Sequence, residues 1–142
     1  MAIQISGTQV ISDTQGLTNI ASVDATTAAS ISAAGVGGGG TYDFVASGAI
    51  SAGNVVALNT AGTVSVVSSS NIANWVGIAT AAISSGATGT VTIFTGTNDQ
   101  QSGLTAGTVY YANTSGGLST SGTYKVGKAI SATEILITEG NA

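Results

Sequence analysis

The stretch ISAGNVVALNTAGTVS, residues 50–65, returns without gaps as LTAGTVYYANTSGGLS, residues 104–119. The Ala-Gly, Asn-Thr and later Gly positions coincide in the two copies, and these residue types set turns. The segments between the turns are rich in β-branched and aromatic residues, which favour strands. Each copy then runs into a related segment, VGIA from residue 76 and VGKA from residue 126. We therefore predict two similar β-meanders in one compact unit, with chance similarity in a low-complexity sequence as the alternative.

The same pattern of short strand-like segments continues through the body of the chain, residues 41–142. Turn sequences such as NTAG, SSGATG and NTSGG separate these segments. The expected strands are residues 42–46, 54–58, 63–67, 75–80, 89–94, 108–112, 124–130 and 134–138. Short strands at this spacing are typical of a barrel or a sandwich. The sequence therefore predicts an all-β fold, either a small β-barrel or a sandwich.

The first 34 residues differ from this body. Residues 3–11, IQISGTQVI, alternate like a strand, and residues 24–35, DATTAASISAAG, fit a short helix with Asp24 as N-cap and Gly35 as the C′ residue. Because the apolar content of that helix is mostly alanine, it buries little by itself. We expect residues 1–34 to form an extended arm that orders against a partner. The alternative is that they add edge strands to their own barrel.

The arm carries apolar side chains suited to contact with a partner. These candidates are Ile3, Ile5, Val10, Ile11, Leu17, Ile20 and Val23. A glycine-rich joint at residues 35–40 follows, and its backbone freedom predicts a hinge between arm and body. The hinge residues are Gly35, Gly37, Gly38, Gly39 and Gly40. Three of them match a dinucleotide-binding fingerprint, but that site needs a helix after the glycines, and here a strand is expected.

Ionisable residues are scarce in this chain. Charged residues make up 6% of it, against about 25% in an average soluble domain. The net charge is −4 with two cations, which leaves no electrostatic footprint for nucleic acid. His and Cys are absent, and the carboxylates are scattered without a close pair. We therefore expect no enzyme activity, no metal, no cofactor and no nucleic-acid partner. Residues 97–100, TNDQ, are expected as an exposed turn, with a weak cation site as the alternative.

Nothing in the sequence points to a membrane. No apolar run reaches the roughly 18 residues of a membrane-spanning helix. The N-terminal sequence MAIQISGTQV lacks the basic and apolar regions of a signal peptide. We therefore expect no membrane partner, and a protein made in a cytoplasm.

The two cations are Lys125 and Lys128, and both lie in one expected strand. Strand alternation would place one face as Tyr124, Val126, Lys128 and Ile130, with Lys125 on the other. Either lysine could protect an edge strand or pair with Glu134 across a hairpin. The alternative is that Lys128 meets an acidic partner in an assembly.

Aromatic residues supply the other candidates for contact. Trp75 begins an expected strand, and it suits either a core anchor or an interface anchor. Tyr110 and Tyr111 are consecutive, so one should face the core and the other solvent or a neighbour. The candidate interface anchors are therefore Trp75, Tyr110, Tyr111 and Lys128.

Three stretches of the chain resemble a known class of protein. Residues 102–137, SGLTAGTVYYANTSGGLSTSGTYKVGKAISATEILI, resemble a module of tailed-bacteriophage structural proteins, found in head decoration and fibre proteins. Residues 48–67, GAISAGNVVALNTAGTVSVV, resemble the opening of small capsid-decorating β-barrels. Residues 5–35, ISGTQVISDTQGLTNIASVDATTAASISAAG, are similar to segments of phage tail-fibre and marine-phage virion proteins. Together these stretches cover nearly the whole chain.

The resemblance implies a non-enzymatic component on the exterior of a virion, made in the host cytoplasm. Shortness and the lack of a collagen-like or coiled-coil shaft favour a capsid decoration (cement) protein over a fibre. Such a protein would be a homotrimer bound to the major capsid protein, with its arm adding a strand to a neighbour's edge. One alternative is a short head- or tail-fibre component that contacts the host surface. Another is a carbohydrate-binding module with Trp75 or a tyrosine stacked on sugar.

Overall fold

A computed structural model of the chain describes residues 3–5, 8–11 and 40–139. Its strands are β1 (Ile3–Ile5), β2 (Thr8–Ile11), β3 (Thr41–Val45), β4 (Val55–Leu58), β5 (Val64–Val66), β6 (Trp75–Ala79), β7 (Thr88–Thr92), β8 (Thr97–Asn98), β9 (Val109–Ala112), β10 (Leu118–Ser119), β11 (Lys125–Ala129) and β12 (Ile135–Ile137). One short 3-10 helix, η1 (Ile72–Asn74), precedes β6. The chain divides into two compact units, residues 1–38 and 39–142, which are described separately.

The first unit contains an antiparallel hairpin of β1 and β2. Ile5 pairs with Thr8, and Ile3 pairs with Ile11 across an irregularity in the register. The strand-like alternation over residues 3–11 therefore corresponds to two strands, β1 and β2. The Ser-Gly sequence between the two strands accounts for the difference, since these residue types favour turns. The short helix expected over residues 24–35 lies outside the described residues.

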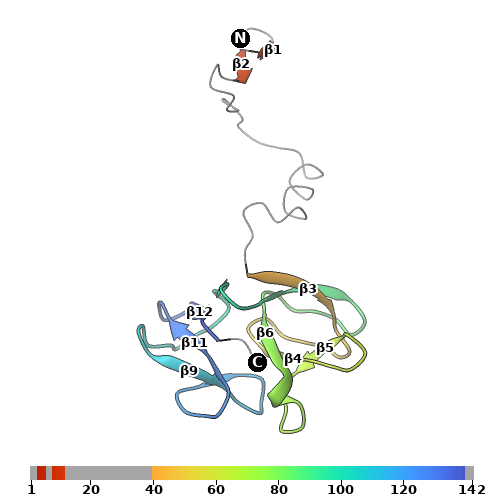
Figure 1. Cartoon of the computed structure of the whole chain (residues 1–142), viewed down its shortest axis with the longest axis vertical. Coiled ribbons are helices and arrows are strands. Elements are labelled where there is room, and N and C mark those ends of the chain that lie inside the picture. The colour runs from red at the N-terminus through yellow and green to blue at the C-terminus, as the bar shows by residue number, and fades with distance from the viewer. Residues whose placement is uncertain (1–2, 6–7, 12–39, 140–142) are drawn as a thin grey trace. The chain divides into compact units, whose positions relative to one another are not determined.

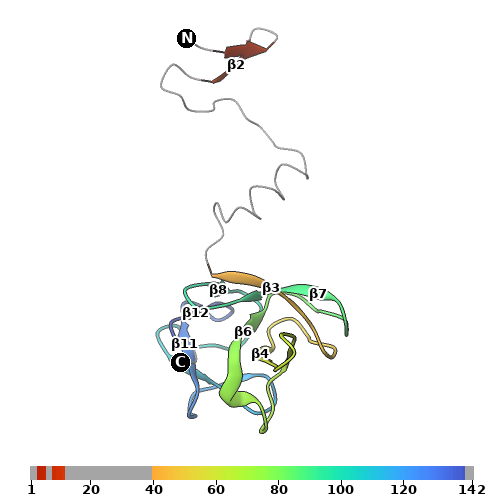
Figure 2. The same cartoon turned by 45° about the vertical axis from the view of Figure 1, so that its right-hand side comes forward.

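The body contains two five-stranded antiparallel sheets with the same strand order (Figures 1 and 2). The first sheet runs β3-β7-β6-β4-β5 and the second β8-β12-β11-β9-β10. We call β3–β7 the first repeat and β8–β12 the second repeat. In each repeat the first strand of the chain lies beside the fifth, then the fourth, second and third. The predicted all-β class built from two similar units is confirmed. Two packed sheets fit a sandwich better than a closed barrel.

The two repeats also agree in strand register. The pairs in the first repeat are Val55↔Ile78, Val56↔Gly77 and Ala57↔Trp75, and those in the second are Val109↔Lys128, Tyr110↔Gly127 and Tyr111↔Lys125. Each ladder skips one residue, Val76 in the first repeat and Val126 in the second. Both are β-bulges, which re-aim the side chains on either side. Residues that align in the two sequence copies therefore also occupy equivalent positions in the strand pairing.

A glycine beside each bulge allows the neighbouring strand to approach closely. A Cβ on Gly77 would collide with the carbonyl oxygen of Thr92, and one on Gly127 with the carbonyl oxygen of Leu136. These contacts are equivalent, since Thr92 pairs with Ile78 and Leu136 with Lys128. The repeated glycine therefore has a packing role in both sheets.

The apolar core lies mainly between the two sheets. This shared core contains Val55, Ala57, Val67, Ile72, Trp75 and Ile78 from the first repeat and Tyr110, Ala112, Val126, Ala129, Ile135 and Ile137 from the second. A second cluster, which includes Val56, Ala79 and Val91, lies on the other face of the first sheet. Because side chains alternate along a strand, each sheet has two distinct faces.

The repeats pack through non-equivalent faces. Val55 and Ile78 of the first repeat face the shared core, whereas their counterparts Val109 and Lys128 do not belong to it. In the second repeat the adjacent residue Tyr110 faces the shared core instead. Equivalent faces of the two sheets therefore point in the same direction. The face that the first sheet turns to the core corresponds to the outer face of the second sheet, so the two outer faces of the sandwich differ.

One buried amide joins the two repeats. Asn98 is 1% exposed, and its Nδ2 donates to the carbonyl oxygen of Ala79 at 3.3 Å and to Thr92 Oγ1 at 3.2 Å. Its Oδ1 accepts from the backbone N–H of Gln100 at 3.1 Å and from Gln101 Nε2 at 3.2 Å. The expectation of an exposed turn over residues 97–100 is therefore wrong at Asn98, which belongs to β8. Polar character alone did not distinguish a turn residue from a buried, fully bonded amide.

The first sheet is curled at one end. Ala46 bridges Val64 in parallel, and the Ser47 N–H donates to the Val64 carbonyl oxygen at 2.8 Å. The segment after β3 therefore meets β5, although β3 and β5 lie at opposite edges of the sheet. Ala46 and Val64 both belong to the second apolar cluster, so this contact closes part of that cluster.

Candidate functional site

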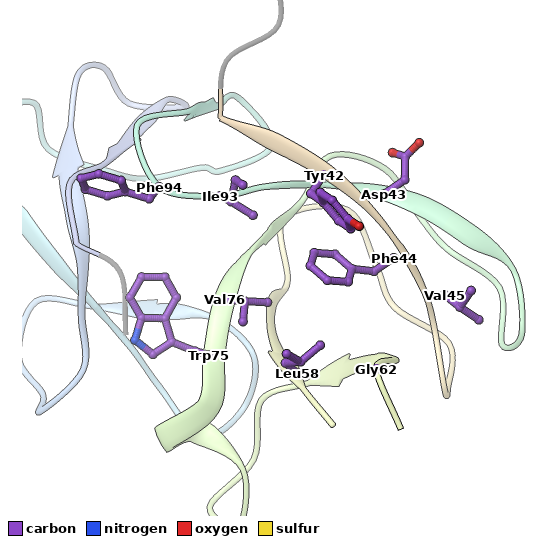
Figure 3. A pocket seen from close by; sticks show the side chains of 10 residues that line it. All are labelled: Tyr42, Asp43, Phe44, Val45, Leu58, Gly62, Trp75, Val76, Ile93 and Phe94. Carbon is purple, nitrogen blue, oxygen red and sulfur yellow. The ribbon is translucent and has the colours of Figure 1, made fainter. Parts of the chain in front are cut away.

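An apolar groove of about 670 Å³ lies in the first repeat, beside β3 (Figure 3). Tyr42, Val45, Leu58 and Phe94 line it, and they are four of the five exposed large hydrophobic residues in the described part of the body. Tyr42 is 60% exposed and Phe94 53%. Clustered exposed apolar side chains on a small protein mark an interaction surface more often than scattered ones do.

An aromatic pair on β3 forms one wall of the groove. Tyr42 and Phe44 are two residues apart on the strand and so share a face, and their ring centroids lie 4.8 Å apart. Figure 3 shows both rings directed into the groove, while Asp43 points away from it. The Asp43 carboxylate accepts a hydrogen bond from Thr90 Oγ1 on β7. The interior of the groove therefore carries no charge.

The opposite wall comes from β6 and from the segment after β7. Val76, the residue of the first bulge, and Ile93 pack against the second apolar cluster and line the groove. Phe94 follows Ile93 and precedes Thr95, a β-branched residue with φ +69°. This left-handed conformation is unfavourable for threonine, and the Thr95 N–H donates to the Ile137 carbonyl oxygen at 3.0 Å. The hydrogen bond to Ile137 of the second repeat thus stabilises the strained backbone at Thr95, next to Phe94.

One edge of β3 has no partner strand among the described residues. The Gly40 carbonyl accepts from Ile93 N–H and the Ala46 N–H donates to Ala87, so even-numbered residues bond toward β7. Ser47 bonds in the other direction, to Val64. By strand parity, the odd positions Thr41 and Asp43 direct their backbone N–H and C=O groups to the free edge, which ends at Val45, where the Ala46–Val64 bridge brings in β5. The groove therefore adjoins a row of hydrogen-bonding backbone groups.

This combination suits binding to another polypeptide. An extended segment can hydrogen-bond to a free edge while its side chains enter adjacent apolar pockets. Within the described ranges, no group of three or more carboxylate, His or Cys side chains is placed to hold a metal ion. The expectations of no enzyme activity and no cofactor stay predictions.

The candidate residues of the arm are placed only in part. Ile3 and Ile5 belong to β1, and Val10 and Ile11 belong to β2. The remaining arm candidates, Leu17, Ile20 and Val23, lie outside the described residues, as do Gly35, Gly37, Gly38 and Gly39 of the hinge. Gly40 is described and has φ +78°, a conformation that favours glycine.

Two of the candidate interface anchors are core residues. Trp75 is 2% exposed and belongs to the shared core, and it also borders the groove (Figure 3). Tyr110 is 6% exposed, and its hydroxyl accepts from the Thr105 N–H at 3.0 Å. Tyr111 is partly exposed. The expectation that one of the two tyrosines faces the core is confirmed, with Tyr110 as that residue.

The lysines lie differently from the expectation. The bulge at Val126 breaks strand alternation, so Val126 is buried while Lys125 and Lys128 are both exposed. Lys125 Nζ lies 3.0 Å from Glu139 Oε1, so its partner is Glu139 and not Glu134. Edge protection is also excluded, because β11 lies in the middle of its sheet. Contact of Lys128 with an acidic partner stays a prediction.

The two lysines stand where the first repeat has large buried residues. Lys125 corresponds to Trp75 and Lys128 to Ile78 in the equivalent ladders. Trp75 and Ile78 belong to the core between the sheets, whereas Lys125 and Lys128 are exposed. Charged residues on such a face discourage the stacking of a further sheet. Both cations thus lie on the exposed face of the second sheet.

The groove itself was missed by inference from sequence. The Tyr-x-Phe spacing of Tyr42 and Phe44 signals two rings on one strand face, but it does not say which face is buried. Phe94 was placed at the end of an expected strand that in fact stops at Thr92. The groove depends on the curl of the first sheet at Ala46, which has no local sequence signal.

Comparison with known proteins gives no relationship from which to transfer a role. No protein-family model matches the chain, and no curated protein matches it significantly. In the part of the chain that the structure describes, no helix has the length and apolar character needed to cross a membrane.

Proposed function

We propose that this chain is a non-enzymatic virion protein of a tailed bacteriophage that decorates the outer surface of the capsid and stabilises the head. The observation that carries the proposal is the uncharged apolar groove beside the free edge of β3. Such a surface suits binding to a protein lattice, and the residues that line it form no group of side chains suited to catalysis. The likeness of three sequence stretches to phage decoration and fibre proteins supports the choice of lattice.

In this proposal the major capsid protein is the main partner, and the protein binds as a homotrimer at junctions of the lattice. Backbone hydrogen bonds and apolar burial supply the affinity, with residues 1–34 as a second point of attachment. Several weak contacts per oligomer then act together, because each bound contact raises the local concentration of the next. The head gains resistance to internal pressure without any covalent step.

A sedimentation experiment tests the proposal. Full-length protein is mixed with empty heads of the phage that encodes it, and the heads are pelleted and then heated. We expect saturable binding, a higher unfolding temperature of the heads, and little loss of binding between about 0.1 M and about 1 M salt, since the groove holds no charge. Failure to bind the heads would contradict the proposal.

Groove variants connect the binding to the site. The double variant Tyr42→Ser/Phe94→Ser should weaken binding to heads by about tenfold or more, because two exposed rings are lost from the contact. Ile130→Ser is the matched control, since Ile130 is also exposed, at 50%, but lies outside the groove. Equal weakening by the control variant would disconnect the groove from the binding.

The fibre alternative makes a different prediction. A fibre component would bind whole host cells, and a decoration protein would bind heads. Labelled full-length protein incubated with host cells separates the two. Deletion of residues 1–34 provides a further check, because unchanged affinity of the truncated chain for heads would exclude a role of the arm in attachment.

A further inference from the structure

The sheet face that carries the groove has a counterpart in the second repeat. The strand pairing of the two sheets aligns the repeats residue by residue. The buried residues that the second repeat contributes to the shared core are Tyr110, Ala112, Val126, Ala129, Ile135 and Ile137. Their counterparts in the first repeat are, in the same order, Val56, Leu58, Val76, Ala79, Val91 and Ile93. The groove therefore lies on the face that corresponds to the junction between the two sheets.

This face is only partly covered in the first repeat. Val56, Ala79 and Val91 are buried in the second apolar cluster. The other three counterparts line the groove instead: Leu58, Val76 and Ile93. Leu58 is exposed, whereas the equivalent Ala112 of the second repeat is buried in the shared core. The groove is thus the part of a junction face against which no sheet packs among the described residues.

The first strand of each repeat differs in what it contributes to this face. Strand pairing aligns residues 41–44, TYDF, with residues 97–100, TNDQ. In the second repeat Asn98 donates across the junction to the Ala79 carbonyl oxygen and to Thr92 Oγ1. Tyr42 takes the equivalent position in the first repeat, where its exposed ring is directed into the groove (Figure 3). A ring in place of this amide favours an apolar surface as the occupant of the groove.

The internal junction shows what kind of surface packs on such a face. The first sheet contributes the buried side chains of β4 and β6 to it, among them Val55, Trp75 and Ile78. The described members of the shared core carry no charge. A matching occupant of the groove is therefore an uncharged apolar face of another sheet.

A second copy of this chain does not offer that surface in the same mode of packing. Trp75 and Ile78 of the first sheet are already buried in the shared core. The equivalent positions on the outer face of the second sheet are Lys125 and Lys128. Docking of that face on the groove would bury two ammonium groups against apolar side chains, which is costly. The occupant is therefore a different protein.

We propose that the groove binds an uncharged apolar face of a β-sheet in the major capsid protein, packed on it as the first sheet of this chain packs on the second. The identity of this partner rests on the proposed function, whereas the kind of surface follows from the internal repeat. Tyr42 and Phe94 are the exposed rings that this sheet would cover.

Exchange of the two lysines tests the kind of surface without capsids. Lys125→Trp/Lys128→Ile gives the outer face of the second sheet the side chains that the first sheet turns to the core. The groove of another copy can then accept this face. Sedimentation velocity should show concentration-dependent assemblies larger than those of the wild type, because the new face and the groove are different surfaces and form a head-to-tail contact. Circular dichroism verifies that the variant is folded.

A groove variant shows whether these assemblies use the groove. Tyr42→Asn/Phe94→Thr introduces the residue types that the second repeat has at the equivalent positions 98 and 138. Added to Lys125→Trp/Lys128→Ile, it should weaken assembly by about tenfold or more, whereas the control Ile130→Ser should leave assembly unchanged. Folded Lys125→Trp/Lys128→Ile that assembles no further than wild type, or assembly that the groove variant does not reduce, would overturn the proposal.

Photo-crosslinking identifies the surface on the partner. Full-length protein with Phe94→p-benzoylphenylalanine is bound to empty heads, illuminated, and analysed by mass spectrometry. We expect links to residues of the major capsid protein that lie two apart in a strand, because alternate side chains share one face of a sheet. Binding to heads with links only to a loop or helix, or to another copy of this chain, would overturn this inference but not the proposed function. Absence of binding to heads would refute the proposed function and the partner, and the assembly of Lys125→Trp/Lys128→Ile would still decide the kind of surface.

Discussion

At the scale of the residue, Asn98 has the most demanding environment in the body. Its side-chain amide is buried and bonded to groups on β6, β7 and the segment after β8. Removing one partner of a buried hydrogen bond leaves the other without water or protein to bond to. Thr92 Oγ1, which is buried and accepts from Asn98 Nδ2, would be left in this position.

Asn98→Ala should therefore lower the free energy of unfolding by about 1–3 kcal/mol or more. Asn74→Ala is the matched control, because Asn74 is exposed and should change stability by less than about 0.5 kcal/mol. Urea denaturation of both variants provides the measurement. Equal stability of the two variants would mean that the network at Asn98 is dispensable.

Three single residues illustrate which features can be predicted from the sequence and which cannot. Tyr110 and Tyr111 were correctly assigned to opposite faces because strand alternation is a local property. The same rule gave the wrong face for Lys128, since a bulge at Val126 intervenes and a bulge has no clear local signature. Asn98 was missed for a related reason, since its burial depends on partners far away in the sequence.

At the scale of the element, the repeated ladder of β4 with β6 and of β9 with β11 is the defining feature. The eight body strands of three or more residues were predictable because β-branched residues and glycine-rich turns alternate along the body. β8 and β10 were not, since two-residue strands carry no periodicity. The repeated glycine in the ladder was visible in sequence, but its packing role became clear only from the approach of the neighbouring strand.

Gly77→Ala and Gly127→Ala should each destabilise the body, because the new methyl group meets a backbone carbonyl that cannot rotate away. We expect a cost of about 1–3 kcal/mol for each, as for other overpacked sites. Gly48→Ala is the control, since nothing lies within 4 Å of its added Cβ and its φ is ordinary. Thermal unfolding measured by circular dichroism compares the three. A loss at only one of the two ladder glycines would contradict their equivalence.

At the scale of the whole molecule, the two repeats share one core. Trp75 of the first repeat belongs to the same core cluster as Ile135 and Ile137 of the second, and Asn98 bonds across the same junction. Separation of the two sheets would expose these residues to water. The repeats therefore form one folding unit, although the sequence copies suggest two modules.

We expect the body to unfold in a single transition. Trp75 is the only tryptophan in the chain and lies in the shared core, so its fluorescence reports the contact between the sheets. Far-UV circular dichroism reports the strands themselves. The two urea curves should coincide, as they do for a two-state domain. A fluorescence transition that clearly precedes the loss of strand signal would show that the sheets separate first.

The stacking of the two sheets in one sense has a consequence for the order of the repeats along the chain. If the second repeat preceded the first and the same mode of stacking were kept, Lys125 and Lys128 would take the buried places of Trp75 and Ile78. Two buried lysines cost far more than an altered loop. A circularly permuted chain should therefore keep the original contact between the two sheets, with a long linker joining the repeats. Which faces of the sheets pack together is thus determined by Lys125 and Lys128 and not by the order of the repeats along the chain.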